Sequence, residues 1–147
     1  MYLEMNKELY KTPKEKMGYI AETLVFEYFK GTMSTDKFDS KKDGMIGDET
    51  AEVKCQNRHP KGYMTVNTAW KNQAPKCKSV DRLFFVEYDS SPDATLWECI
   101  DREDTKLIHT LDGRKMLGWP ISKMKLVTTF KGKGDELRKY TSSKILK

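Results

Sequence analysis

The chain has 147 residues, of which 37% are hydrophobic and 33% are charged, and its formal net charge is +5 at pH 7. This length suits one domain over residues 1–147, and three Trp, seven Tyr and six Phe argue against wholesale disorder. No stretch approaches the about 18 uninterrupted apolar residues of a membrane span, and the first sixteen residues lack the apolar core of a signal peptide, so we expect a cytoplasmic location.

The charged residues are unevenly distributed along the chain. Residues 53–80 contain six Lys or Arg and no acid, residues 87–104 contain seven acids and one Arg, and residues 122–147 contain eight bases and two acids. Two basic blocks can fold into one face that neutralises phosphates, or they can form a solubilising surface that binds no partner. Charge alone leaves both interpretations open.

The first predicted element is a helix that starts after Thr12 and ends near Gly31. Thr12 is a favourable N-cap, Pro13 suits the first helical position, and Glu15 completes a capping box. Apolar residues at helical spacing predict one stripe that covers a core. Glu22 lies at the edge of this stripe, where its carboxylate either leans inward toward a metal or stays exposed.

Short extended segments follow this helix. Turn residues Gly47 and Asp48 separate two of them, which predicts a β-hairpin. A further short strand and a short helix, which Asn67 caps and which ends near Pro75, come next. The extended segments are predicted at residues 37–38, 43–46, 50–56 and 63–66, and the short helix at residues 67–74.

The second half of the chain begins with its most distinct strand, residues 82–88. Its continuous apolar run, Leu83 to Val86, is typical of a strand that is covered on both faces. We expect a second strand at residues 94–100, a helix at 101–113 between Asp101 and Gly113, a strand at 123–130 and a terminal helix at 135–146. This order predicts an α/β (α+β) domain with one mixed β-sheet between helices.

The segment Thr50–Gln56 carries the most informative pattern. In a strand, Ala51, Val53 and Cys55 point to one side, and Glu52, Lys54 and Gln56 point to the other. Such alternation is also what any half-exposed strand shows. If Asp43 on the preceding strand projects to the same side as Glu52, the two carboxylates and the Val53 carbonyl form a hard oxygen site that suits Mg²⁺.

A metal ion at such a site has a defined chemistry. It lowers the pKa of a water molecule, orients a phosphodiester and neutralises the charge that builds up during in-line displacement. Lys54, beside Glu52, is suited to positioning the attacking water or to stabilising the phosphorane charge.

With Glu22 on a preceding helix and with Asp43, Glu52 and Lys54 on a hairpin, the sequence resembles the PD-(D/E)xK nuclease superfamily, which includes restriction endonucleases, Holliday junction resolvases and RecB-like nucleases. The resemblance covers about Met17 to Ile100. It implies a restriction endonuclease-like core, Asp43 and Glu52 as metal ligands, Lys54 as the catalytic lysine, Glu22 as an additional acid and Gln56 as a polar helper.

Two features depart from the family pattern. Lys42 rather than Pro precedes Asp43, and Asp48 is a rival first carboxylate. Asp48 belongs to the predicted turn, only four residues before Glu52, so we expect it at the hairpin tip and prefer Asp43.

The resulting hypothesis is an Mg²⁺-dependent deoxyribonuclease, with Mn²⁺ as a substitute metal and with selectivity for a junction, flap or single strand. Resolvase-like relatives act as symmetric dimers, so a homodimer is a further expectation, and the small size would suit a phage or mobile element. The alternatives are a non-catalytic nucleic-acid-binding module and a protein-interaction domain. Candidate phosphate contacts, each also explicable as an ordinary surface residue, are Arg58, Lys61, Lys71 and Gln73.

Overall fold

The computed structural model describes residues 12–35, 42–67, 73–109 and 113–145. The helices are α2 (Pro13–Phe29), α3 (Gln73–Ser79) and α4 (Lys133–Ile145), and a short 3-10 helix, η1, covers Ile121–Lys123. The strands are β1 (Thr32–Met33), β2 (Gly44–Ile46), β3 (Glu49–Cys55), β4 (Tyr63–Asn67), β5 (Arg82–Glu87), β6 (Ala94–Cys99), β7 (Lys106–His109), β8 (Lys115–Pro120) and β9 (Lys125–Phe130). No helix among the described residues is long and apolar enough to cross a membrane.

Helix α2 begins as the sequence predicts. The Thr12 hydroxyl accepts the Glu15 N–H at 3.1 Å, and Pro13 occupies the first position. The left-handed residue at the other end is Lys30, with φ of 57°, and not Gly31. A Cβ on Gly31 would lie 2.4 Å from the Met45 carbonyl oxygen. Glycine is therefore required at position 31 by the close approach of β2.

The larger sheet has six strands in the order β1-β2-β3-β5-β6-β9. Strands β3 and β5 are parallel and the other neighbours are antiparallel, so the sheet is mixed. The apolar run in β5 is buried on both faces, as predicted: Leu83 and Phe85 face one side, and Phe84 and Val86 face the other. The mixed α/β character that the sequence indicates is present in the fold.

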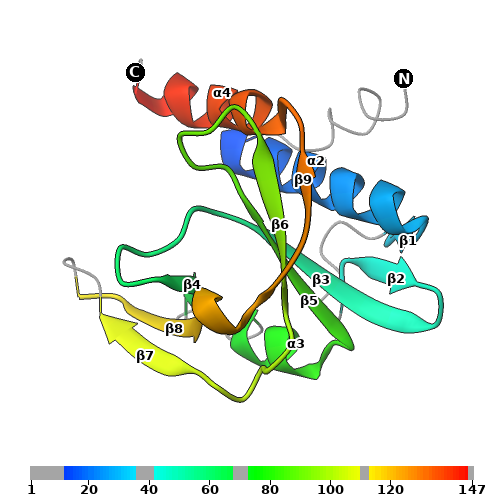
Figure 1. Cartoon of the computed structure of the whole chain (residues 1–147), viewed down its shortest axis with the longest axis vertical. Helices are drawn as coiled ribbons and strands as arrows, with labels where there is room; N and C mark the ends of the chain where they lie inside the picture. The colour runs from blue at the N-terminus through cyan, green and yellow to red at the C-terminus, as the bar shows by residue number, and fades with distance from the viewer. Residues whose placement is uncertain (1–11, 36–41, 68–72, 110–112, 146–147) are drawn as a thin grey trace.

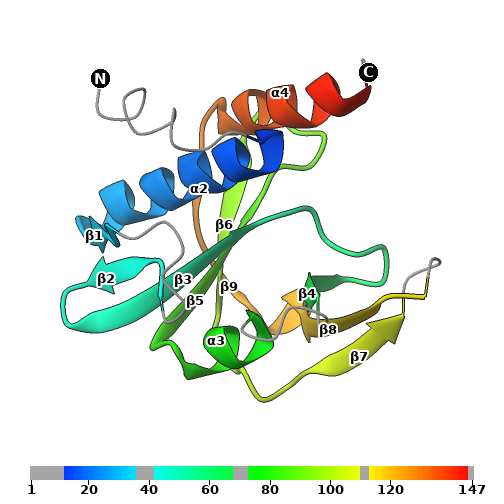
Figure 2. The same ribbon diagram turned by 180° about the vertical axis from the view of Figure 1, so that it is seen from behind.

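Different elements cover the two faces of this sheet. Helices α2 and α4 lie side by side on one face, and α3 lies on the opposite side together with β4, β7 and β8 (Figures 1 and 2). The first core includes Ile20, Val25, Ala51, Val53, Phe84 and Leu137. The second core includes Met64, Cys77, Val80, Leu83, Phe85 and Trp119.

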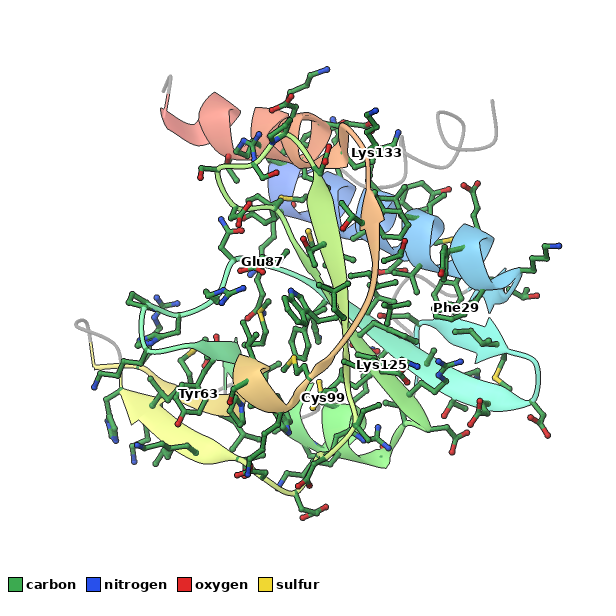
Figure 3. All side chains as sticks on the ribbon, in the orientation of Figure 1. Phe29, Tyr63, Glu87, Cys99, Lys125 and Lys133 are labelled. Atoms are coloured by element: carbon green, nitrogen blue, oxygen red, sulfur yellow. The ribbon has the colours of Figure 1, made fainter. Side chains whose placement is uncertain are left out.

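The prediction of one sheet between helices was incomplete, because a second sheet of three strands, in the order β4-β8-β7, replaces a helical layer on one face. Side chains fill the space between the two sheets, with Cys99 on this side of the larger sheet (Figure 3). Trp119 of β8 is fully buried there, and its Nε1 donates to the Arg102 carbonyl at 3.0 Å.

The predicted helix at residues 101–113 was wrong. Asp101 does not act as a helix cap, because its side chain accepts the N–H of Glu103, two residues on, in a local turn. The chain then enters β7, in which Leu107 pairs with Leu117 of β8. Pairing with a strand that the sequence analysis missed outweighs the helix-like spacing of this segment.

The short helix was also placed incorrectly. It covers Gln73–Ser79, with Pro75 in its first turn, where a missing N–H removes no intrahelical bond. Asn67 ends β4 and does not begin a helix. The predicted strand at residues 37–38 and most of the predicted helix at 67–74 lie outside the described residues.

Candidate functional site

Strand β3 separates apolar from charged side chains. Ala51 and Val53 enter the first core, under α2. Glu52 and Lys54 alternate with them and therefore project to the opposite face, where α3 lies. Glu52 is only 1% exposed, so its carboxyl group must find its partners inside the protein.

Asp43 lies where β2 separates from β3. The last residue pair of this ladder joins Gly44 to Ala51, and the Asp43 N–H donates to the Ala51 carbonyl at 2.9 Å. Beyond this point the Asp43 Oδ2 atom accepts the Val53 N–H at 2.8 Å. A side-chain carboxylate thus replaces the next main-chain carbonyl of a partner strand, and this bond fixes the Asp43 carboxylate over β3.

The Val53 carbonyl faces the same edge of β3. In a strand, the N–H and C=O of one residue point to the same neighbour, and the Val53 N–H points to Asp43. The Asp43 carboxylate and the Val53 carbonyl therefore lie on the same edge of β3. Asp48, the rival carboxylate, is exposed in the turn after β2.

Two lysines approach the carboxylates. Lys54 Nζ lies 3.0 Å from Glu52 Oε2. Lys76 Nζ lies 3.1 Å from Glu52 Oε1 and 3.6 Å from Asp43 Oδ1, so its ammonium group bridges the two acids. The Lys76 side chain is 9% exposed and the Lys54 side chain 20%.

Lys76 is the site residue that the sequence analysis missed. It belongs to α3, which Cys77 and Val80 anchor in the second core. The only signal in the sequence was the acid-free basic segment, in which Lys76 is one of six bases. Its acidic partners are far away along the chain, and helix propensity does not reveal which side chains a short helix brings to a strand.

Glu22 of α2 interacts electrostatically with these two acids and two lysines. Burial, followed by the negative charges of Asp43 and Glu52, raises the pKa of Glu22 to about 9. Burial and the charge of Glu52 raise the pKa of Asp43 to about 7. We call Glu22, Asp43, Glu52, Lys54 and Lys76 the carboxylate cluster. It contains three carboxyl groups and two ammonium groups. This excess of buried carboxyl groups favours protonation of a carboxylate or binding of a cation.

Gln56 takes a different role from the one predicted. Its Nε2 atom donates to the Thr65 carbonyl at 2.7 Å, and its Oε1 atom accepts the Thr65 N–H at 2.7 Å. Both ends of the amide are thus used to attach the end of β3 to β4. Gln56 is therefore a structural link between the two sheets in this structure.

Arg58 is likewise engaged within the protein. Its Nε atom donates to Glu87 Oε2 at 2.7 Å, its second nitrogen donates to Glu87 Oε1 at 3.0 Å, and the guanidinium lies 5.9 Å from the centre of the Trp97 ring. Glu87 also accepts a bond from Trp97 Nε1 at 3.0 Å and lies on the side of β5 that faces the smaller sheet (Figure 3). The Arg58 guanidinium is thus already hydrogen-bonded to the Glu87 carboxylate.

The other predicted phosphate contacts differ in placement. Lys61 is exposed in the loop before β4, beside a shallow hollow of about 330 Å³ whose lining includes Tyr63 and Pro120. Lys71 lies outside the described residues. Gln73 begins α3, but the position of its side chain is not described.

The donor set of the cluster fits a hard divalent cation. Among the described residues, no three His, Cys, Asp or Glu side chains form a ready-made metal group. Two carboxylates, Asp43 and Glu52, do lie on either side of one cation, the Lys76 ammonium, and the Val53 carbonyl faces the same edge. Carboxylate and carbonyl oxygens suit Mg²⁺, which keeps water for the rest of its shell. The sequence matches no protein-family model, and no curated protein is significantly similar to it.

Proposed function

We propose that this protein is an Mg²⁺-dependent nuclease that hydrolyses phosphodiester bonds in DNA, with a restriction endonuclease-like core of the PD-(D/E)xK type. The observation that carries the proposal is the convergence of Asp43, Glu52 and Lys54 at the point where β2 separates from β3. An ordinary solvated hairpin does not bury a glutamate to 1% exposure or surround it with two lysines.

The roles follow from the positions of the side chains. Asp43, Glu52 and the Val53 carbonyl would hold the metal. Mg²⁺, when bound, neutralises charge on the phosphodiester and lowers the pKa of the attacking water. Lys54 is the lysine of the cluster more open to solvent, so its ammonium is suited to contact a phosphate oxygen as a point charge. In the metal-free protein, burial and the charges of Asp43 and Glu52 raise the pKa of Glu22 to about 9, and a bound cation would offset the charges that raise it.

The arrangement of the elements supports the proposed fold type. A helix, α2, precedes the β2–β3 hairpin, and β3 then runs parallel to the apolar strand β5 within a mixed sheet. The resemblance implies a helix followed by a mixed sheet that carries the Asp and the acid-x-Lys triplet on adjacent strands. Here the triplet lies inside β3, and Asp43 directly precedes β2.

The substrate part of the proposal rests on charge and on the resemblance to resolvase-like nucleases. The basic segments favour a polyanionic partner. We propose that this partner is DNA and that the protein recognises DNA structure, such as a junction, flap or single strand. A symmetric homodimer would place two carboxylate clusters on one substrate.

The test is cleavage by the purified protein of branched, single-stranded and duplex DNA with Mg²⁺, Mn²⁺ or EDTA. We expect metal-dependent products from at least one substrate, and none from Glu52→Ala, which should still bind DNA. Asp48→Ala is the matched control, because it removes an exposed acid from the same hairpin. Salt-sensitive binding without cleavage would instead identify a non-catalytic nucleic-acid-binding module, and failure to cleave DNA or RNA would overturn the proposal.

A further inference from the structure

We propose that Lys76 is a tethered counter-ion that occupies the metal position in the metal-free protein and leaves it when a divalent cation binds. This inference rests on the proposed function, because it concerns the same carboxylate cluster. Its basis is the position of the ammonium group, which lies 3.1 Å from Glu52 Oε1 and 3.6 Å from Asp43 Oδ1. Asp43 directly precedes β2 and Glu52 lies within β3, so the Lys76 ammonium bridges carboxylates from two segments of the hairpin.

The burial of the three groups explains why a resident cation is needed. The side chains of Glu52, Lys76 and Asp43 are 2%, 9% and 15% exposed, respectively. Carboxylates that are removed from water and placed beside one another repel, unless a positive charge lies between them. The Lys76 ammonium supplies that charge in the absence of metal, so the cluster can form before the cation arrives.

The same position makes Lys76 a competitor of the metal. A Mg²⁺ ion bound by both carboxylates lies about 2.1 Å from each ligand oxygen. It would occupy the space between Asp43 and Glu52 that the ammonium holds, and two cations this close together repel strongly where water is excluded. Metal binding therefore requires the ammonium to move away.

Lys54 is placed differently, because its Nζ atom lies 3.0 Å from the other carboxylate oxygen of Glu52, Oε2, whereas Lys76 Nζ bridges Glu52 Oε1 and Asp43 Oδ1. The backbone of Lys76 need not move, since α3 is anchored by Cys77 and Val80 in the second core. A change of side-chain rotamer on a flexible four-carbon stem is sufficient to withdraw the ammonium toward solvent. Once withdrawn toward solvent, the ammonium can contact a phosphate group of a nucleic acid that binds beside the cluster.

A permanent positioning role for Lys76 predicts the opposite effect of substitution. If the ammonium stays in place and orients Glu52 in the loaded protein, removal of its charge will leave metal affinity unchanged or weaken it. If it is a resident competitor, removal of its charge will strengthen metal binding. Metal affinity, measured without DNA, therefore separates the two roles.

The experiment is titration of the full chain with Mn²⁺ by calorimetry, with electron paramagnetic resonance of free Mn²⁺ as a second readout. We expect Lys76→Met and Lys76→Gln to bind Mn²⁺ about tenfold or more tightly than the unmodified protein, since each removes one adjacent positive charge. Lys78→Met is the matched control, because Lys78 is exposed on the same helix, and it should leave the affinity unchanged. Lys76→Gln retains a hydrogen-bonding side chain, in case Lys76→Met does not fold.

Unchanged or weaker Mn²⁺ binding in the folded Lys76 variants would overturn the inference. Absence of Mn²⁺ binding in every variant would overturn both the inference and the metal site of the proposed nuclease. Tighter binding in the Lys76 variants, together with no cleavage of any nucleic acid by the unmodified protein, would support the counter-ion and refute the nuclease. The two proposals can therefore fail separately.

Discussion

The Asp43 carboxylate accepts the backbone N–H of Val53 at 2.8 Å, so a side chain continues the hydrogen bonding of β3 where the β2 main chain has already left it. The same carboxylate faces the Lys76 ammonium through its other oxygen. One oxygen of Asp43 is thus structural, and the other belongs to the charged cluster. This division means that loss of the hydrogen bond and loss of the charge can be measured independently.

Asp43→Ala and Asp43→Asn should therefore differ in stability. Alanine leaves the Val53 N–H without its acceptor and should lower the free energy of unfolding by about 1–3 kcal/mol. Asparagine retains an acceptor oxygen and removes a charge from a crowded acidic cluster, so its stability should equal or exceed that of the unmodified protein. Urea denaturation in EDTA measures both, and both variants should lose Mn²⁺ binding. Equal destabilisation by the two substitutions would contradict this division of roles.

Glu22→Gln should stabilise the metal-free protein, and increasingly so as the pH rises. The pKa of Glu22 is raised from 4.5 to about 9 in the fold, so between these values the native carboxyl keeps a proton that the unfolded chain has lost. Stability must then fall as the pH rises through this window, and glutamine removes that loss. Melting temperatures at pH 5, 7 and 8.5 in EDTA test this trend, with the exposed Glu27→Gln on the same helix as control. A difference in melting temperature between Glu22→Gln and the unmodified protein that stays constant with pH would contradict this prediction.

Lys54→Met should separate catalysis from metal binding. If Lys54 contacts the phosphate in the transition state, its loss should lower kcat about 10²–10³-fold, as the removal of one stabilising donor commonly does. Mn²⁺ affinity should not weaken, because lysine is not a ligand and its positive charge is removed. Single-turnover cleavage and calorimetry on the same preparation measure the two effects. Equal cleavage by Lys54→Met and the unmodified protein would remove Lys54 from the proposed mechanism.

The hairpin and the central strand could be predicted because their determinants are local. The alternation around Glu52 assigns the charged side chains to one face, Gly47 allows the turn, and the apolar run that begins at Leu83 requires cover on both sides. These features assign Glu52 and Lys54 to one face of the strand. The length of the turn then predicts that Asp43 lies near them on the preceding segment.

Lys76 and the smaller sheet could not be predicted, because their determinants are tertiary. Lys76 resembles any other base in its segment until α3 places it over β3. Asp101 has the signature of a helix cap but forms a two-residue turn, and Leu107 finds its partner on a strand ten residues later, Leu117. Gln56 matches a family position, yet the sequence does not show that β4 lies within reach of its amide.

Arg58 and Lys61, both predicted as phosphate contacts, should now behave differently. Arg58 lowers the pKa of the buried Glu87 by hydrogen bonding, although burial alone would raise it. Arg58→Ala should therefore reduce stability by about 1–3 kcal/mol at pH 7, because it leaves a buried carboxylate with fewer partners. A carboxyl group with a lowered pKa contributes stability above its unfolded pKa of 4.5 and loses it as the pH falls, so the deficit of Arg58→Ala should shrink in acid.

Lys61→Ala should leave stability within about 0.5 kcal/mol, because Lys61 is exposed in a loop. If Lys61 contacts a phosphate, DNA affinity should fall, and the slope of log affinity against log salt should decrease by about 1. Urea denaturation at pH 4, 5 and 7, together with DNA binding over a salt series, compares the two variants. A change in salt slope for Arg58→Ala without any loss of stability would show that Arg58 serves DNA and not Glu87. An unchanged slope for Lys61→Ala would place the DNA on another face of the protein.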